Sequence, residues 1–157
     1  MSTRSLIGLK NAETNTVKYI YCHFDGHPEC VGSILKTSYN TEEKVEEMLK
    51  LGHLSSLGHT LEPSEITRRF GFIGTLSGEF HDLSEEEQEK LKKDHSSAKY
   101  TTAYGRDRGE DGVQAKETTT QKYLSFDSTD FIYLFADGEW YCQNWDGTPV
   151  EIQEEKE

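Results

Sequence analysis

Residues 19–35 read Tyr-Ile-Tyr-Cys-His-Phe-Asp-Gly-His-Pro-Glu-Cys-Val-Gly-Ser-Ile-Leu, and this stretch decides the fold that we expect. Its first part has apolar or aromatic side chains on both faces, as in a strand that is covered on both sides. Asp25 to Pro28 are turn formers, and the apolar residues beyond them recur at helical spacing. The stretch therefore predicts a central strand over 17–24, a turn, and a short helix over 29–39.

Two hairpins are predicted near the ends of the chain. Residues 5–10 are strand-like and are separated from the strand 17–24 by the polar turn formers 11–16. Residues 130–144 carry two aromatic runs on either side of Asp137-Gly138, which is a favoured two-residue hairpin turn. We expect both pairs of strands to be antiparallel.

A second helix is predicted after the first. Asn40 or Thr41 can cap it, and acidic residues fill its first turn, where the helix dipole favours negative charge. Gly52 is expected to end this helix. Residues 53–58 predict one further turn that ends at another glycine.

The middle of the chain carries weaker patterns. Residues 60–97 are interpreted as a partly exposed excursion, in which the charged run 85–93 has acids first and lysines last, as in a solvated helix. Residues 100–104 predict a strand and 105–111 a loop. After a turn at Asp146-Gly147 the chain offers a few more strand-like residues.

The order of these elements predicts an α+β domain, with an antiparallel sheet of about four to six strands and two or three short helices packed on one face. Residues 1–150 are expected to form a single domain. Residues 151–157 read as an acidic tail that frays.

The net charge of −12, from 29 acidic and 17 basic residues, argues against binding to nucleic acid or to an anionic membrane surface. It favours basic partners, including proteins that themselves bind nucleic acid. The chain has no apolar run close to the roughly 20 residues that a membrane helix needs, and no apolar core of a secretory signal at its N-terminus. We therefore expect a soluble, intracellular protein.

Several potential metal ligands lie close together after the first hairpin: Cys22, His23, Asp25, His27 and Cys30. Neighbouring residues of a strand face opposite sides, so Cys22 and His23 cannot enter one site, either as ligands or as a Cys-His nucleophile. The cysteines, including Cys142, follow no zinc-ribbon or thioredoxin spacing and suit reduced thiols. We predict neither a metal nor a cofactor.

Two other groups offer binding chemistry. His23 and Asp25 are two residues apart and can share a face, which would give an imidazole oriented by a carboxylate. Arg106 and Arg108 flank Asp107 in a glycine-bounded segment and could present two guanidinium groups to a phosphate or carboxylate. The alternative interpretation of these arginines is local pairing with acids such as Glu110.

Five stretches of the chain are distinctive as a set: the opening Met-Ser-Thr-Arg-Ser-Leu-Ile-Gly, Ile20 to Gly26 with Pro28 and Gly32, Gly52 to Gly58, Ala103 to Glu110, and Phe131 to Trp140. Through these stretches the chain resembles a family of small, largely uncharacterised proteins encoded by tailed bacteriophages. The resemblance covers nearly all of the chain except 60–97. The family's turn reads Asp-Gly-Tyr-Pro, so His27 departs from the pattern and Cys30 is not a motif position.

The matching positions imply a polar pocket between the strand end and the arginine segment. The residues expected to bind a ligand there are His23, Asp25, Tyr104, Arg106, Asp107 and Arg108. The resemblance also implies a phage accessory protein that acts in the host bacterium's cytoplasm, where it counters host defence or redirects host machinery.

Three mechanisms remain open. The leading hypothesis is a binding module that sequesters an anionic, nucleotide-type signal. The second is an acidic protein that mimics nucleic acid and occludes a host nuclease or another protein that binds nucleic acid. A phosphodiesterase-like hydrolase that uses His23 is the third, and we favour binding over turnover. The sequence leaves the oligomeric state open and is compatible with a homo-oligomer.

Overall fold

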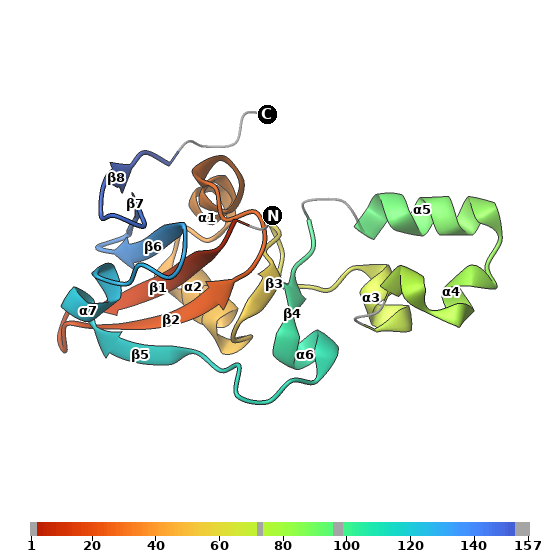
Figure 1. Cartoon of the computed structure of the whole chain (residues 1–157), viewed down its shortest axis with the longest axis horizontal. Helices are drawn as coiled ribbons and strands as arrows, with labels where there is room; N and C mark the ends of the chain where they lie inside the picture. Colours follow the sequence, from red (N-terminus) through yellow and green to blue (C-terminus); the bar gives the residue numbers. More distant parts are fainter. Residues whose placement is uncertain (1–2, 72–73, 96–98, 153–157) are drawn as a thin grey trace.

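A single mixed sheet organises the computed structural model, which describes residues 3–71, 74–95 and 99–152 (Figure 1). Its eight strands follow the order β4-β3-β2-β1-β6-β7-β8, and β5 also pairs with β2. Most neighbours are antiparallel, but β1 and β6 are parallel, as are β2 and β3. The strands are β1 Ser5–Asn11, β2 Thr16–Cys22, β3 Leu54–Ser56, β4 Thr102–Ala103, β5 Lys116–Thr119, β6 Phe131–Ala136, β7 Glu139–Asn144 and β8 Pro149–Val150.

Both predicted hairpins are confirmed. β1 and β2 pair along their whole length, from Ser5 opposite Cys22 to Asn11 opposite Thr16. At the turn between β6 and β7, Asp137 has a φ of 52° and Gly138 a φ of 78°, the two positive values that this kind of hairpin requires. The parallel pairing of β1 with β6 joins the two hairpins. β2 lies inside the sheet, between β1 and β3, as expected, and β1 lies inside it too.

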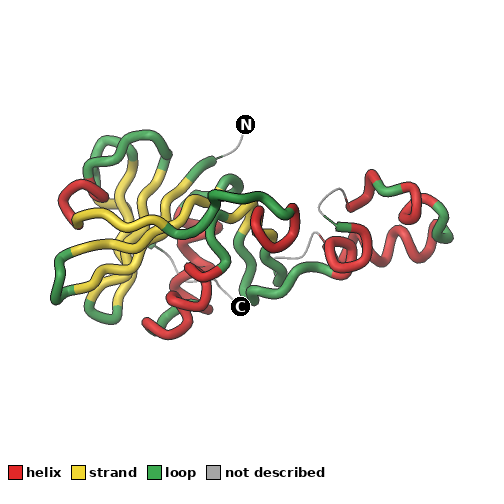
Figure 2. The backbone as a smooth tube through the Cα atoms, turned by 90° about the horizontal axis from the view of Figure 1, so that it is seen from below, coloured by secondary structure: helices red, strands yellow, loops and turns green. Residues whose placement is uncertain are grey.

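Helices α1 and α2 cover one face of the sheet (Figures 1 and 2). A π-helical turn, η1 (Pro28–Gly32), leads into α1 (Ser33–Ser38), and α2 spans Glu42–Lys50. The Thr41 side chain accepts the N–H of Lys44 and caps α2, as predicted. The buried residues between these helices and the sheet include Ile7, Ile20, Cys22, Leu35, Val45, Met48, Leu54 and Tyr133.

The opposite face carries a smaller apolar cluster under α7 (Thr120–Leu124). Tyr123 of α7 is fully buried there and donates its hydroxyl hydrogen to the carbonyl of Tyr133, at 2.6 Å. Gly8 makes room for this ring, because a Cβ at that position would lie 2.8 Å from Cζ of Tyr123. Neither β5 nor α7 was expected from the sequence, since β5 is largely exposed and has no alternating apolar pattern.

The segment predicted as an excursion forms a group of helices that projects from the sheet between β3 and β4 (Figures 1 and 2). We call it the helical insertion; its elements are α3 Glu65–Phe70, the 3-10 turn η2 Gly74–Leu76, α4 Gly78–His81 and α5 Glu85–His95. It has a small core of its own, made by Ile66, Phe80 and Leu91. No helix in the described part of the chain is both long and apolar enough to cross a membrane.

Two local predictions were wrong. Residues 53–58 contain the short strand β3 rather than a further turn, and 105–111 begin with the helix α6 (Tyr104–Arg108) rather than a loop. β3 exists because Leu54 pairs with Cys22 on one side and with Ala103 of β4 on the other. No local sequence pattern predicts these contacts. The α+β class is confirmed, with more strands than expected and two parallel pairs.

Only the first two residues of the predicted acidic tail are described, since residues 153–157 lie outside the described residues. Of these two, Glu151 is exposed, whereas Ile152 is buried against the core beneath α1. The chain therefore remains packed for two residues beyond β8.

Candidate functional site

The side chains of β2 fall on two faces of the sheet. Cys22 points into the core under α1 and α2, and Tyr21 and His23 point to the opposite side, as strand alternation requires. The Tyr21 and His53 rings meet edge to face, with centroids 6.2 Å apart. Tyr104 lies beside His53, because its main-chain N–H donates to the carbonyl of His53 at 3.2 Å. We call Tyr21, His23, His53 and Tyr104 the Tyr21 cluster.

His53 fills a gap in the hydrogen bonding of β2. On this side β2 pairs with β5 up to Tyr19 and with β3 at Cys22, which leaves Tyr21 between the two partner strands. The N–H of Tyr21 donates to Nδ1 of His53 at 3.0 Å. A nitrogen that accepts a hydrogen bond carries no proton, so this ring is neutral and its hydrogen is on Nε2.

The surroundings of His53 keep it in this neutral form. Burial lowers the pKa of His53, and the positive charge of Lys116 lowers it further. Burial disfavours the charged form of a phenol too, so it raises the pKa of Tyr21, whereas the positive charge of Arg4 lowers this pKa. The cluster therefore presents an imidazole and a phenol that are both uncharged near neutral pH.

His23 is held by its neighbours in the sequence. Its Nδ1 lies 2.6 Å from the hydroxyl oxygen of Tyr21, and its ring meets Phe24 edge to face at 4.5 Å. Phe24 is 44% exposed, so its ring remains open to a binding partner. This part of the predicted site thus has a fixed imidazole beside an accessible aromatic surface.

Arg106 and Asp107 have a structural role. The Asp107 carboxylate accepts from Nε and Nη2 of Arg106, at 2.9 and 3.1 Å, and from the N–H of Ala103 at 2.7 Å. The guanidinium also donates to the carbonyls of Leu61 and Thr101, one on each chain segment at the base of the helical insertion. The donors that we expected to bind a ligand are therefore used to hold this base together.

The remaining predicted residues are more exposed. Asp25 has a φ of 58° at the exit from β2, and its carbonyl accepts the N–H of Val31. Arg108 lies 3.8 Å from Glu110, the local pairing that we had considered as the alternative. Because β3 runs between β2 and β4, the strands that lead to His23 and to Arg106 are not neighbours.

Of the predicted set, only Tyr104 and His23 belong to the Tyr21 cluster. Sequence reasoning missed Tyr21 as a site residue, and it missed the contact that His53 makes with Tyr21. Tyr21 was visible as a member of the aromatic strand, but no spacing or motif connects it with His53, which lies 32 residues further along the chain.

The thiols offer little reactivity. Burial raises the pKa of both Cys22 and Cys142 to about 12, so neither is a thiolate at neutral pH. Cys30 is partly exposed, and burial and the charge of Asp25 raise its pKa too. Among the described residues, no three His, Cys, Asp or Glu side chains are grouped so as to hold a metal ion.

A serine-histidine pair lines a separate hollow of 410 Å³ next to α1. Ser38 Oγ and His59 Nδ1 are 2.6 Å apart, with Lys44 and Glu47 in the same wall. Ser38 is the last residue of α1, where the helix dipole is negative and would oppose an oxyanion. A similar pair, Ser64 and His95, occurs in the helical insertion, so we interpret both as structural.

Comparisons of this chain with models of protein families, with curated proteins and with solved structures find no match.

Proposed function

We propose that this protein is a phage accessory protein that works in the host bacterium by binding, and that the Tyr21 cluster holds an anionic ligand of nucleotide type. The observation that supports this is the convergence of His23, His53 and Tyr104 around Tyr21 on a sheet face that the larger helices do not cover. The phage origin rests on the resemblance of the sequence motifs. The ligand class rests on the chemistry of the cluster.

The cluster combines a hydrogen-bond donor with two nearby cations. Nε2–H of the neutral His53 is the donor, and the exposed Arg4 and Lys116 act electrostatically on Tyr21 and His53 respectively. In a chain of net charge −12, such a place attracts a phosphate more strongly than the surface around it does.

Aromatic rings in and beside the Tyr21 cluster favour the binding of nucleotides over free phosphate. Phe24 is partly exposed, packs against His23 and can stack on a base, as can the half-buried ring of Tyr104. Stacking contributes about 1–3 kcal/mol per base in proteins that bind single-stranded nucleic acid. A nucleotide should therefore bind more tightly than inorganic phosphate.

Thermal shift and calorimetric titrations with cyclic and linear nucleotides test this proposal. We expect binding that raises the melting temperature and that weakens by about tenfold in the double variant Arg4→Ala/Lys116→Ala. Lys90→Ala, on the exposed surface of α5, is the matched control and should bind like the wild type. If no nucleotide shifts the melting temperature, or the double variant binds unchanged, the proposal fails.

The same titrations separate binding from hydrolysis. A binding module returns the nucleotide intact, as chromatography of the mixture would show. Turnover that disappears in His23→Ala would instead identify the phosphodiesterase-like alternative. Arg106→Ala is not a suitable probe of ligand binding, because this side chain holds the base of the helical insertion.

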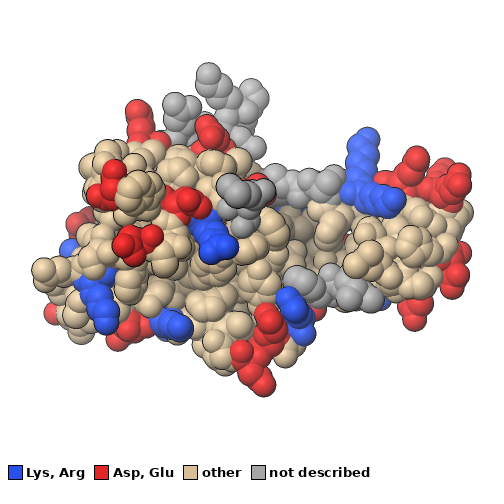
Figure 3. All heavy atoms as spheres, in the orientation of Figure 1, with Lys and Arg blue, Asp and Glu red and all other residues tan. Residues whose placement is uncertain are grey.

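A second function, occlusion of a basic host protein, is favoured by the helical insertion. Acidic side chains gather on its far end (Figure 3), where Glu85, Glu86, Glu87 and Glu89 are all exposed on α5. A projecting acidic helix can reach a basic groove that binds nucleic acid, and α2 adds a second exposed acidic group, Glu42, Glu43, Glu46 and Glu47.

A pull-down from host lysate at low salt tests this second function. The expected complex dissociates as salt rises, and reversing three charges on α5 should weaken it by an order of magnitude or more. Reversing three charges on α2 shows which of the two surfaces makes the contact. Recovery of no host protein, or a complex insensitive to both reversals, would exclude this function.

A further inference from the structure

The outer edge of β7 is only partly covered. β8 pairs with it at Cys142 and Gln143, and in the described part of the chain this ladder extends no further toward Glu139. On its inner side β7 pairs with β6 throughout, including Trp140 with Phe135 and Tyr141 with Leu134. Alternate residues of a strand direct their N–H and C=O groups to opposite sides, so the first half of β7 is a short strand edge at which only every second residue turns these groups away from β6.

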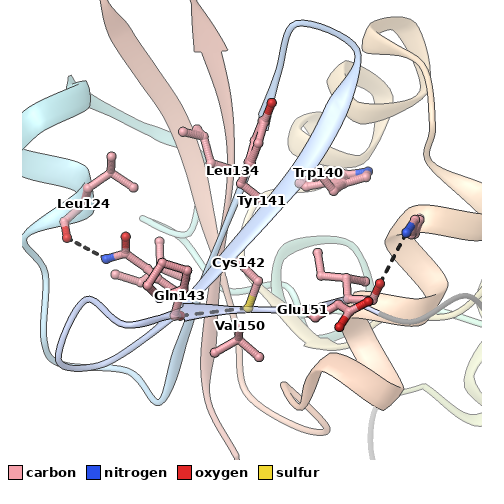
Figure 4. A pocket seen from close by; sticks show the side chains of 12 residues that line it. Leu124, Leu134, Trp140, Tyr141, Cys142, Gln143, Val150 and Glu151 are labelled. Atoms are coloured by element: carbon pink, nitrogen blue, oxygen red, sulfur yellow. Dashed lines mark hydrogen bonds between the residues drawn. The ribbon is translucent and has the colours of Figure 1, made fainter.

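A cavity of 480 Å³ lies along this edge (Figure 4). Its walls come from both faces of the sheet, because consecutive residues of β7 point to opposite sides. Tyr141 and Leu134 belong to the wall on the α7 side, and Trp140 and Ile152 to the wall on the α1 side. After Val150, the last residue of β8, the chain turns away from β7 at Glu151, and the cavity opens between this segment and β7 (Figure 4).

The polar groups around the cavity are already used within the protein. Trp140 donates its indole N–H to the carbonyl of Tyr39 at 2.7 Å, and the amide of Gln143 donates to Leu124 at 2.7 Å. The ammonium of Lys36 donates to the carbonyl of Ile152 at 3.2 Å. What remains for a partner is apolar side-chain surface together with the strand edge.

Two large side chains at this place are exposed to an extent unusual for apolar groups. Tyr141 is 51% exposed and Leu124 is 36% exposed, and both line the cavity. An exposed apolar surface beside unpaired backbone groups is a feature of sites that accept an added strand.

Lys36, which binds the carbonyl of Ile152, is a cation in the lining of the cavity, and the other charges that we consider beside it are acidic. Glu151 lines it and is exposed, and Glu139 accepts a hydrogen bond from the Tyr141 hydroxyl at 3.4 Å. The negative charge of Glu139 raises the pKa of Tyr141, and the charge of Asp137 acts in the same direction. A partner with lysine or arginine next to its apolar residues would complement these acidic charges.

We propose that the outer edge of β7 binds an extended segment of a partner protein, which adds a strand beside Glu139, Trp140 and Tyr141. Residues of an added strand alternate between the two faces, so its apolar side chains would meet the Tyr141 wall or the Trp140 wall in turn, and basic residues would lie near Glu139 and Glu151. β8 limits the open edge to these three residues of β7. This site is separate from the Tyr21 cluster.

Fluorescence anisotropy with a labelled peptide, Lys-Val-Lys-Ile-Lys-Val-Lys-Ile, tests the proposal on the full chain. We expect saturable binding, and about tenfold weaker binding when alternate peptide nitrogens are methylated, because methylation removes the backbone hydrogen bonds. A peptide with glutamate in place of lysine should also bind at least about tenfold more weakly. Equal binding of the methylated peptide would show an apolar ligand site without strand addition and would overturn the proposal.

Variants locate the bound peptide. Tyr141→Ser removes one wall and Glu151→Lys reverses one charge, and since both side chains are exposed, their melting temperatures should match the wild type. Each should weaken peptide binding by about fivefold. Glu46→Lys, on α2, is the matched control for charge and should leave binding unchanged. Equal weakening by Glu46→Lys and Glu151→Lys would indicate general attraction and refute the site.

Discussion

At the scale of single residues, Arg106 shows how tertiary context assigns a role to a side chain. Its sequence neighbourhood suggested that it binds phosphate, but its guanidinium binds Asp107, the carbonyl of Thr101 five residues before it, and the carbonyl of the distant Leu61. Asp107 is only 5% exposed, so its charge depends on this partner. The pair is therefore a clamp at the base of the helical insertion.

Replacing Arg106 with alanine should lower the free energy of unfolding by about 2 kcal/mol, because several charge-assisted hydrogen bonds are lost and Asp107 is left without its cation. Denaturant unfolding measures this loss. Arg108→Ala is the control, since its exposed pair with Glu110 should contribute less than about 1 kcal/mol. Equal losses in the two variants would contradict the clamp.

His53 should make the stability of the protein depend on pH. Its pKa in the folded state is lower than in the unfolded chain, where it is about 6.5, so the unfolded chain binds the proton more readily. The stabilisation that the neutral His53 ring contributes is present in full when the pH is above the pKa of His53 in the unfolded chain. It is lost as pH falls from about 7 through that value toward the lower folded pKa.

In His53→Asn the amide oxygen can still accept the N–H of Tyr21, but nothing titrates at this position. Unfolding free energies measured between about pH 5 and 7.5 should therefore fall less steeply on the acid side than in the wild type. His81→Gln, on the exposed surface of α4, should keep the slope of the wild type. A variant His53→Asn with an unchanged slope would exclude this assignment.

At the scale of elements, two helices end in the same backbone conformation but in different surroundings. Gly52 follows α2 with a φ of 76°, and Gly109 follows α6 with a φ of 73°. A Cβ at Gly52 would lie 2.2 Å from the carbonyl oxygen of Val113, whereas at Gly109 no other atom lies within 4 Å. The end of α2 is thus packed against the segment that leads to β5, and the end of α6 is open.

Alanine at these two glycines should separate backbone strain from crowding. Gly109→Ala should cost about 1 kcal/mol, the penalty of a left-handed conformation for a residue with a Cβ. Gly52→Ala carries the same penalty and must also displace the main chain at Val113, which should add about 1–3 kcal/mol. Thermal or denaturant unfolding of both variants measures the difference, and equal losses would show that the Val113 contact is easily relieved.

At the scale of the whole molecule, the structure combines a sheet with helices on both faces and a projecting helical insertion. The insertion has its own core of Ile66, Phe80 and Leu91, and the larger cores belong to the sheet. Main-chain hydrogen bonds join its two ends, from Thr60 to Lys99 and from Thr101 to Glu62. The ends of β3 and β4 are therefore held together below the insertion.

Replacing residues 64–98 with two glycines should leave the sheet folded, because none of the described residues in the removed segment belongs to the cores of the sheet. We expect the shortened chain to unfold cooperatively. Its free energy of unfolding should depend less steeply on denaturant concentration, since less surface is exposed on unfolding. In the full chain, Phe80→Ala should speed amide exchange in the insertion and leave β1 and β6 unchanged. Loss of cooperative unfolding in the shortened chain would show that the sheet requires the insertion.

What the sequence determined by itself is the local part of the fold. The two hairpins follow from turn residues between strand-like apolar and aromatic runs, and α2 follows from its Thr41 cap and its apolar spacing. The residues that decide each element therefore lie within it or beside it. The sequence also predicted that Cys22 and His23 diverge, since strand alternation is a property of the backbone alone.

Only the tertiary structure decided which distant segments meet. The parallel pairing of β1 with β6 joins Ser5 to Phe131, and β3 and β4 are strands only because they lie beside β2 and each other. His53 belongs to the Tyr21 cluster because of a gap that three strands create, and Arg106 reaches Leu61 across 45 residues. Such contacts depend on the packing of elements against one another, which leaves no local periodicity in the sequence.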